Sequence, residues 1–175
     1  MKSLHTSAFT PAFPLFFLSI HLAVGQTAGN TSYHQDSDTG ITLPDGFDAE
    51  LLYSVPEDQG SWVAMAFDPN GRIVVSDQDD KGVFRVTLPS EGSEIGVESL
   101  KGFPYEPIPW GERQVGGALG FLYAFDSLYM SSMKGLYRIR DTDGDDTYDD
   151  FKLLSKLNHG YEHSAHSIIP SEDGK

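Results

Sequence analysis

The chain contains one six-residue phrase twice, and this repetition limits the folds that are available to it. Lys81-Gly82-Val83-Phe84-Arg85-Val86 returns as Lys134-Gly135-Leu136-Tyr137-Arg138-Ile139. In each copy a glycine suited to a turn precedes residues that alternate between the two faces of an extended strand. The phrase therefore predicts that the same half-buried β-strand is built twice.

The residues around this phrase repeat as well, at offsets that change only across turns. Ala66-Phe67-Asp68 returns 58 residues later as Ala124-Phe125-Asp126, and Ile73-Val74-Val75-Ser76 returns 55 residues later as Leu128-Tyr129-Met130-Ser131. A third copy begins at Ser167-Ile168-Ile169. Several short strands per unit, repeated at about 50 residues, are typical of β-propeller blades. We therefore expect an all-β, incomplete β-propeller with two blades and the start of a third, from a ring of about six.

The first 25 residues have the features of a secretory signal peptide. Lys2 is their only charged residue, residues 12–24 are mostly apolar, and Ala23-Val24-Gly25 supplies small residues for cleavage. A membrane anchor is the alternative, but the apolar stretch is shorter than the roughly 20 residues that a membrane-spanning helix needs. We expect an exported protein, periplasmic or extracellular, with no membrane span in the mature chain.

Turn signals and composition divide the rest of the chain. The expected parts are a flexible linker at 26–42 and the N-terminal part of a propeller domain at 43–175. Within that domain we expect a strand at 49–55, a first blade at 62–88 with a closing strand near 95–100, a second blade at 118–157 and a third blade from about His163. No helix of ordinary length is expected. The proline-containing loop at 102–117 is either a contact at the rim or part of a site.

Composition excludes several classes of protein. The chain has 12 Lys and Arg against 26 Asp and Glu, a formal net charge of −14, so it has no basic stripe for a nucleic acid. It has no cysteine, which excludes disulfides, thiolate catalysis, iron–sulfur ligation and a C-x-x-C-H haem site in this chain. The expected partners are neutral or cationic, or are held through a metal.

An acidic run follows the second copy of the repeated phrase. Asp141, Asp143, Asp145 and Asp149 stand at relative positions one, three, five and nine, the spacing with which calcium loops surround a hard cation. The run is not an EF-hand, because its sixth position is not glycine and its twelfth is not glutamate. The alternative is a solvated acidic turn that joins two strands. A bound calcium ion would fasten the hairpin rather than take part in a reaction.

Three of the six histidines lie within residues 159–166, in an order other than H-E-x-x-H. Three interpretations stay open: a general base at the head of an inner strand, a metal site, or polar loop residues with ordinary hydrogen bonds. Residues at the heads of successive inner strands converge on one mouth of a propeller, so Gln114 and His163 are expected to share a pocket. There a neutral His163 imidazole could take a proton from a substrate hydroxyl group, and Gln114 could orient the partner.

At these residues the chain resembles the soluble quinoprotein glucose dehydrogenase and sorbosone dehydrogenase family of six-bladed propellers. The segment Gln114-Val115-Gly116-Gly117-Ala118-Leu119-Gly120-Phe121 is similar to that family's glycine-rich entry to its second inner strand. The segment Glu162-His163-Ser164-Ala165-His166-Ser167-Ile168-Ile169 is similar to the one that holds its catalytic histidine, which matches His163. The resemblance implies pyrroloquinoline quinone with calcium on the top face, Gln114 at the cofactor rim, and oxidation of a sugar or other alcohol by hydride transfer to the quinone.

Residues 122–129 and 136–145 look like those of exported bacterial relatives in which the propeller precedes helical repeats and a cytochrome c domain. A cytochrome is thus the implied electron acceptor. The acidic run does not match the family's cofactor calcium site. We expect the N-terminal part of an exported glucose/sorbosone dehydrogenase-like propeller, inactive by itself; the alternative is a non-catalytic exported propeller that binds carbohydrate or protein. Inner strands without neighbours have unpaired edges, which favour aggregation or pairing with another chain, so we also expect that the chain alone is not a stable monomer.

Overall fold

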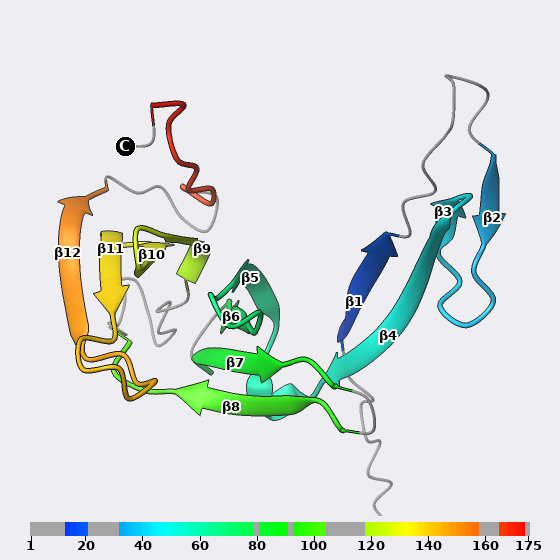
Figure 1. Cartoon of the computed structure of the whole chain (residues 1–175), viewed down its shortest axis with the longest axis horizontal. Helices are drawn as coiled ribbons and strands as arrows, with labels where there is room; N and C mark the ends of the chain where they lie inside the picture. The colour runs from blue at the N-terminus through cyan, green and yellow to red at the C-terminus, as the bar shows by residue number, and fades with distance from the viewer. Residues whose placement is uncertain are drawn as a thin grey trace, which may run out of the picture. The chain divides into compact units, whose positions relative to one another are not determined.

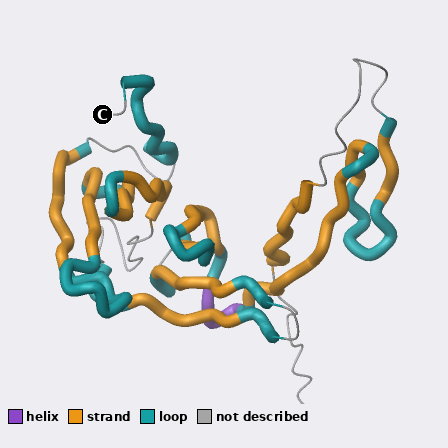
Figure 2. Tube along the Cα trace, in the orientation of Figure 1, coloured by secondary structure: helices purple, strands orange, loops and turns teal. Residues whose placement is uncertain are grey.

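The computed structural model describes residues 13–20, 32–78, 81–90, 93–103, 118–157 and 165–173. Nearly all regular structure in these residues is antiparallel β-strand, as predicted, and their one helix is the short 3-10 helix η1 (Glu57–Gln59) (Figure 2). None of their helices is long and apolar enough to cross a membrane. The chain divides into two compact units, Met1–Pro56 and Glu57–Lys175.

The first unit contains two pairs of antiparallel strands. These are β1 (Phe13–Ile20) with β4 (Phe47–Val55), and β2 (Tyr33–Gln35) with β3 (Thr42–Pro44). The β2–β3 hairpin lies largely where the sequence predicts a flexible linker. Its turn is ordered because the Asp36 carboxylate accepts the backbone N–H groups of Asp38 at 3.1 Å and Thr39 at 2.8 Å. Strand β1 lies inside the predicted signal peptide, so its pairing with β4 belongs to the uncleaved chain.

The second unit contains two four-stranded antiparallel sheets whose strands follow in chain order (Figure 1). The first sheet consists of β5 (Trp62–Phe67), β6 (Ile73–Asp77), β7 (Val83–Thr87) and β8 (Gly96–Leu100), and the second of β9 (Ala118–Ala124), β10 (Ser127–Ser132), β11 (Gly135–Arg140) and β12 (Asp150–Lys156). The strands predicted for two units are therefore present, including the closing strand β8. Residues 165–173, predicted to start a third unit, contain no strand, because no described strand pairs with them.

The two sheets repeat each other in their pairing register. In the first sheet Ile73 lies opposite Val86 and Val75 opposite Phe84; at the equivalent positions of the second, Leu128 lies opposite Ile139 and Met130 opposite Tyr137. Each sheet also has a register shift near the start of its first strand, between Trp62 and Ala64 in β5 and opposite Ser131 and Ser132 in β9. The predicted equivalence of the Lys-Gly strands is thus confirmed at the level of individual residue pairs.

One part of the predicted repeat differs from the structure. Phe67 is equivalent to Tyr123 rather than to Phe125, because Phe67 and Tyr123 lie opposite equivalent residues of the next strand. The Ala-Phe-Asp phrase therefore lies two residues further along the second hairpin. There Phe125 and Asp126 form the turn, with φ of 50° and 52°, as a two-residue turn with both φ positive requires. The longer turn at 68–72 occupies this place in the first hairpin.

The main hydrophobic core joins the two sheets. Its buried side chains include Ala64, Val74 and Val83 of the first sheet and Phe121, Leu128, Met130, Tyr137 and Ile139 of the second. A hydrogen bond from the Ala118 N–H group to the Ser76 hydroxyl, at 2.8 Å, also joins β9 to β6. Burying apolar surface is worth about 25 cal/mol per Å², so this shared core is the chief reason that the two sheets stay together.

Candidate functional site

The acidic loop, residues 141–149, joins β11 to β12. Asp141 orders it, because its two carboxylate oxygens accept the backbone N–H groups of Gly144 at 2.7 Å and Asp146 at 2.8 Å. Desolvation raises the pKa of Asp141, but the hydrogen bonds from the loop backbone outweigh it and lower the pKa overall. The Asp141 carboxylate therefore stays ionised within the loop at neutral pH.

Three of the four predicted metal ligands lie together. Asp141, Asp143 and Asp145 each bring one carboxylate oxygen within 4.8 Å of the others. Ca²⁺ takes roughly six to eight oxygen ligands, so these three carboxylates could supply part of its shell, with backbone carbonyls and water as the rest. Asp149 is not in this group, because its carboxylate accepts the N–H group of Thr142 at 2.9 Å and the Thr142 hydroxyl at 2.6 Å.

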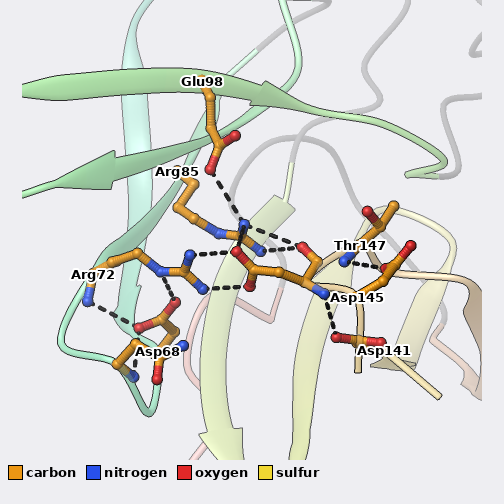
Figure 3. Close-up of polar contacts among 9 residues, drawn as sticks. Asp68, Arg72, Arg85, Glu98, Asp141, Asp145 and Thr147 are labelled. Atoms are coloured by element: carbon orange, nitrogen blue, oxygen red, sulfur yellow. Dashed lines mark hydrogen bonds and ion pairs between the residues drawn. The ribbon is translucent and has the colours of Figure 1, made fainter. Parts of the chain in front are cut away.

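Two arginines of the first sheet, both labelled in Figure 3, hold the acidic loop through hydrogen bonds to Asp146. Arg72, in the β5–β6 turn, donates from Nη1 to Oδ2 of Asp146 at 2.5 Å and from Nη2 to Oδ1 at 2.6 Å. Arg85, in β7, donates to Oδ2 of Asp146 at 3.0 Å and to its backbone carbonyl at 3.2 Å. These three residues, which we call the arginine clasp, connect the first sheet to the β11–β12 loop of the second.

Arg85 is the most buried member of the clasp, with an exposed fraction of 3%. It also donates to Glu98 at 3.2 Å, and its guanidinium carbon lies 5.7 Å from the centre of the Tyr148 ring. Its Nε has no hydrogen-bond partner among the described residues. A buried cation is stable only when opposite charges and acceptors surround it, so Arg85 depends on Asp146 and Glu98. Burial raises the pKa of Tyr148 to about 12, and its phenol stays neutral beside the guanidinium.

Arg72 is held on both sides. Its Nε donates to Asp68 at 2.7 Å, while the other Asp68 oxygen accepts the N–H groups of Asn70 and Arg72, each at 2.9 Å. The hydrogen bond between Arg72 and Asp146 raises the pKa of the arginine and lowers that of the aspartate. Asp146 has a φ of 72°, in the left-handed region that aspartate tolerates better than most residues. The clasp therefore fixes an unusual backbone conformation in the acidic loop.

A cavity of about 110 Å³ lies beside the clasp. The charged residues on its wall are Asp68, Arg72, Arg85, Asp141 and Asp146. Ligand pockets usually enclose about 300 Å³ or more, so this cavity suits water molecules or a small ion better than a sugar. Because four of the five charged side chains already pair with one another, the arrangement stabilises the contact between the sheets.

The two residues predicted to serve catalysis, His163 and Gln114, lie outside the described residues. The structure describes the chain again from Ala165, and the backbone of His166 lies close to Gly120 of β9. A Cβ atom at Gly120 would overlap the backbone carbonyl oxygen of His166, so only glycine allows this approach. His166 itself is exposed.

The arginine clasp was not predicted from the sequence, although the sequence carries one signal for it. Arg85 stands between Phe84 and Val86, and the predicted half-buried strand is wrong for β7, whose residues from Val83 to Val86 are buried on both faces because the Arg85 face is covered by the clasp. A charged residue among such neighbours indicates a buried ion pair, because Arg is almost never fully buried unless it is paired. Its partner could not be named from the sequence, since Asp146 follows 61 residues later.

Comparisons with known proteins identify no relative of this chain. No family model matches the chain, and no match is found among curated proteins or among solved structures. What the site can do is therefore argued from its own residues.

Proposed function

We propose that the two sheets are successive blades of a β-propeller in an exported protein, and that the acidic loop is a calcium site that fastens one blade to the next. The single observation that carries the calcium site is the gathering of three carboxylates at Asp141, Asp143 and Asp145. The shared pairing register of the two sheets and their order along the chain support the assignment as blades.

The position of the loop suggests what calcium would do there. The carboxylates of Asp141, Asp143 and Asp145 repel one another at short range, and a divalent cation removes that repulsion. Asp146 lies in the same loop and holds Arg72 and Arg85 of the other sheet. An ion that orders the loop would keep Asp146 in the clasp, so its role would be structural.

Calcium is expected to bind the chain and to raise its unfolding temperature, by isothermal titration calorimetry and by thermal melts followed by circular dichroism. At a free concentration of about 100 times Kd, binding would add about 2.7 kcal/mol to the free energy of unfolding. Asp143→Asn and Asp145→Asn should each weaken binding about tenfold or more, because each removes a charged ligand.

The matched control for these variants is Asp58→Asn, which removes one exposed carboxylate of η1, away from the loop. It should bind calcium as the unaltered chain does. Absence of a calcium-dependent shift in unfolding temperature, or an equal loss of binding in all three variants, would show that the acidic loop is only a solvated turn.

The resemblance to the glucose and sorbosone dehydrogenase family supports a second proposal. Here the protein oxidises a sugar or other alcohol with pyrroloquinoline quinone, His163 acts as the general base, Gln114 contacts the cofactor rim, and a cytochrome accepts the electrons. The sequence resemblance alone supports this proposal. The competing candidate is a propeller that binds carbohydrate or protein without catalysis.

Dye-linked oxidation of sugars, measured with added quinone and calcium, separates these two candidates. If the protein is a dehydrogenase, His163→Ala should lower kcat about a hundredfold, the loss typical of a removed general base. The control is His34→Ala, in β2 of the other unit, which should retain activity. Activity that is unchanged in His163→Ala removes the assigned role. Because this chain is expected to be inactive by itself, the assay uses the complete propeller, and a complete propeller without activity on any sugar or alcohol favours the binding candidate.

A further inference from the structure

The repeated phrase places an arginine at the same position of each sheet, Arg85 in β7 and Arg138 in β11. Each lies in the third strand of its sheet, Arg85 opposite Val74 of the second strand and Arg138 opposite Tyr129. The Arg85 side chain is 4% exposed in the contact between the sheets, whereas the Arg138 side chain is 26% exposed. Two equivalent side chains therefore differ in what covers them.

The hydrogen bonds of Arg138 are incomplete. Its Nη2 donates to Oδ2 of Asp150 at 3.2 Å, but the same oxygen also accepts hydrogen bonds from Nε and Nη2 of Arg140, at 3.1 Å and 2.8 Å. A carboxylate oxygen has room for about two donors, so Asp150 is chiefly the partner of Arg140. The Nε of Arg138 is buried and has no hydrogen-bond partner among the described residues.

The charges around Arg138 are mostly positive. Lys152 of β12 lies directly opposite it, where the first sheet places Glu98 opposite Arg85. Arg140 follows two residues later on the same side of β11. Arg138, Arg140 and Lys152, which we call the cation patch, thus surround one carboxylate in a chain with a formal net charge of −14. Like charges on opposite residues destabilise a sheet, so the patch costs stability until an anion covers it.

The cation patch lies on the side of the second sheet that is turned away from the first sheet. Tyr137 and Ile139 alternate with the patch residues along β11 and belong to the core that joins the sheets. In the first sheet, by contrast, the side that carries Arg85 faces this core, since Val74 opposite Arg85 is part of it. The patch therefore occupies the side with which the first sheet packs on the sheet that follows it.

The chain after β12 already approaches this side. Gly120 of β9 lies opposite Ser131, two residues from Tyr129, so Gly120 is on the same side as the patch. The backbone carbonyl of His166 lies so close that a Cβ atom at Gly120 would overlap it. The equivalent residue of the first sheet, Ala64, packs into the shared core, where β5 contacts β9. The chain thus returns to the second sheet where β9 meets the first.

We propose that the cation patch binds an acidic loop of a further sheet of the same kind, with a carboxylate placed against Arg138 as Asp146 is placed against Arg85. This inference rests on the proposed assignment of the sheets as blades. The acidic loop of this chain shows the complementary charge, because residues 141–150 include six aspartates. Such a loop would give the Nε of Arg138 an acceptor and would offset the repulsion among the three cations.

The same substitution at the two arginines separates a docking residue from a structural one. Arg85→Met removes a cation that the fold uses, so it should lower the urea midpoint of unfolding by about 1 M. Arg138→Met keeps an apolar side chain and removes a charge with little internal pairing, so the midpoint should move by less than about 0.3 M. Equal losses in the two variants would mean that Arg138 already serves its own sheet, and would overturn the proposal.

Binding can be measured with a synthetic peptide of residues 141–150 added to the isotope-labelled chain in EDTA, so that calcium takes no part. The Nε–H NMR signals of Arg138 and Arg140 should shift with a Kd of about 1 mM, the strength expected for a few charge-assisted hydrogen bonds. Arg138→Gln, followed at Arg140, should weaken binding about tenfold. The matched control is Lys101→Gln, at an exposed cation after β8, which should bind as the natural chain does.

A peptide with the Asp146→Asn change tests whether the carboxylate must be placed as in the clasp, and it should bind about tenfold more weakly. Equal binding of the two peptides, no shift at about 10 mM peptide, or an equal loss in Lys101→Gln rules the proposal out. A failure of the blade assignment is distinguishable, because it appears as separate unfolding of the two sheets and does not alter peptide binding at Arg138.

Discussion

Asp146→Asn is expected to lower the free energy of unfolding of the two-sheet unit by about 2 kcal/mol, within the range for hydrogen bonds to charged groups and below that for a fully buried ion pair, because the Asp146 side chain is half exposed. The reason lies in Arg85, which is almost fully buried and would lose one of its two carboxylate partners, keeping the more exposed Glu98. Arg72 would lose the same partner but is more exposed and keeps Asp68. Asparagine tolerates the left-handed backbone at this position as aspartate does, so the substitution changes charge and little else. Urea unfolding followed by circular dichroism measures the loss.

The matched control is Asp126→Asn, in the exposed turn between β9 and β10. Asp126 also has a positive φ, of 52°, so this variant makes the same chemical change in a similar backbone conformation. It should alter the free energy of unfolding by less than about 0.5 kcal/mol, as most surface substitutions do. If Asp126→Asn costs as much as Asp146→Asn, the clasp does not contribute what its geometry implies.

The pH dependence of unfolding gives a second measurement of the same contact. Hydrogen bonding to Arg72 lowers the pKa of Asp146 in the folded protein below the unfolded value of about 3.9. Its contribution to stability is therefore fully present above the unfolded pKa and is lost as the pH falls through the folded pKa. Between pH 7 and pH 3, stability should fall less steeply in Asp146→Asn than in the natural chain. The pKa values of Asp36, Asp141 and Asp150 are also lowered, so these residues contribute to the slope that remains.

The strand positions and the equivalence of the two Lys-Gly strands could be predicted because they depend on local patterns. The alternation around Phe84 and Tyr137 and the glycines before them mark the equivalent strands, whose register the structure then supplies. The repeated Ala-Phe-Asp phrase does not mark equivalent positions in the two hairpins. It lies at the end of a strand in the first hairpin and in the turn of the second. The β2–β3 hairpin was missed because it depends on a side-chain contact of Asp36 that no periodicity reveals.

The candidate site was predictable only as far as one loop determines it. The spacing of Asp141, Asp143 and Asp145 brings their carboxylates together without help from the rest of the chain. Thr142 donates two hydrogen bonds to the carboxylate of Asp149, and the spacing of the aspartates does not reveal this competing contact. The arginine clasp is a contact between two sheets, so it follows from their packing rather than from any one segment. The roles of His163 and Gln114 stay predictions.

Leu128→Ala is expected to have the largest effect of the substitutions considered, a loss of about 4 kcal/mol in the free energy of unfolding. Leu128 is fully buried in the core that joins the two sheets. Its truncation removes apolar contacts and leaves a cavity that neighbouring strands cannot close, because both are held in register by hydrogen bonds. Urea unfolding of the purified variant measures this loss directly.

The comparison with Leu154→Ala tests whether the core belongs to both sheets. Leu154 lies on the last strand of the second sheet and is 42% exposed, so the same truncation there should cost less than about 1 kcal/mol. If the two sheets unfold together, Leu128→Ala and Asp146→Asn should shift one common transition, since each weakens a contact between the sheets. Two separate transitions would mean that each sheet is stable without the other. Equal costs at Leu128 and Leu154 would mean that Leu128 does not lie in a tightly packed core. Either result contradicts the shared core on which the blade assignment depends.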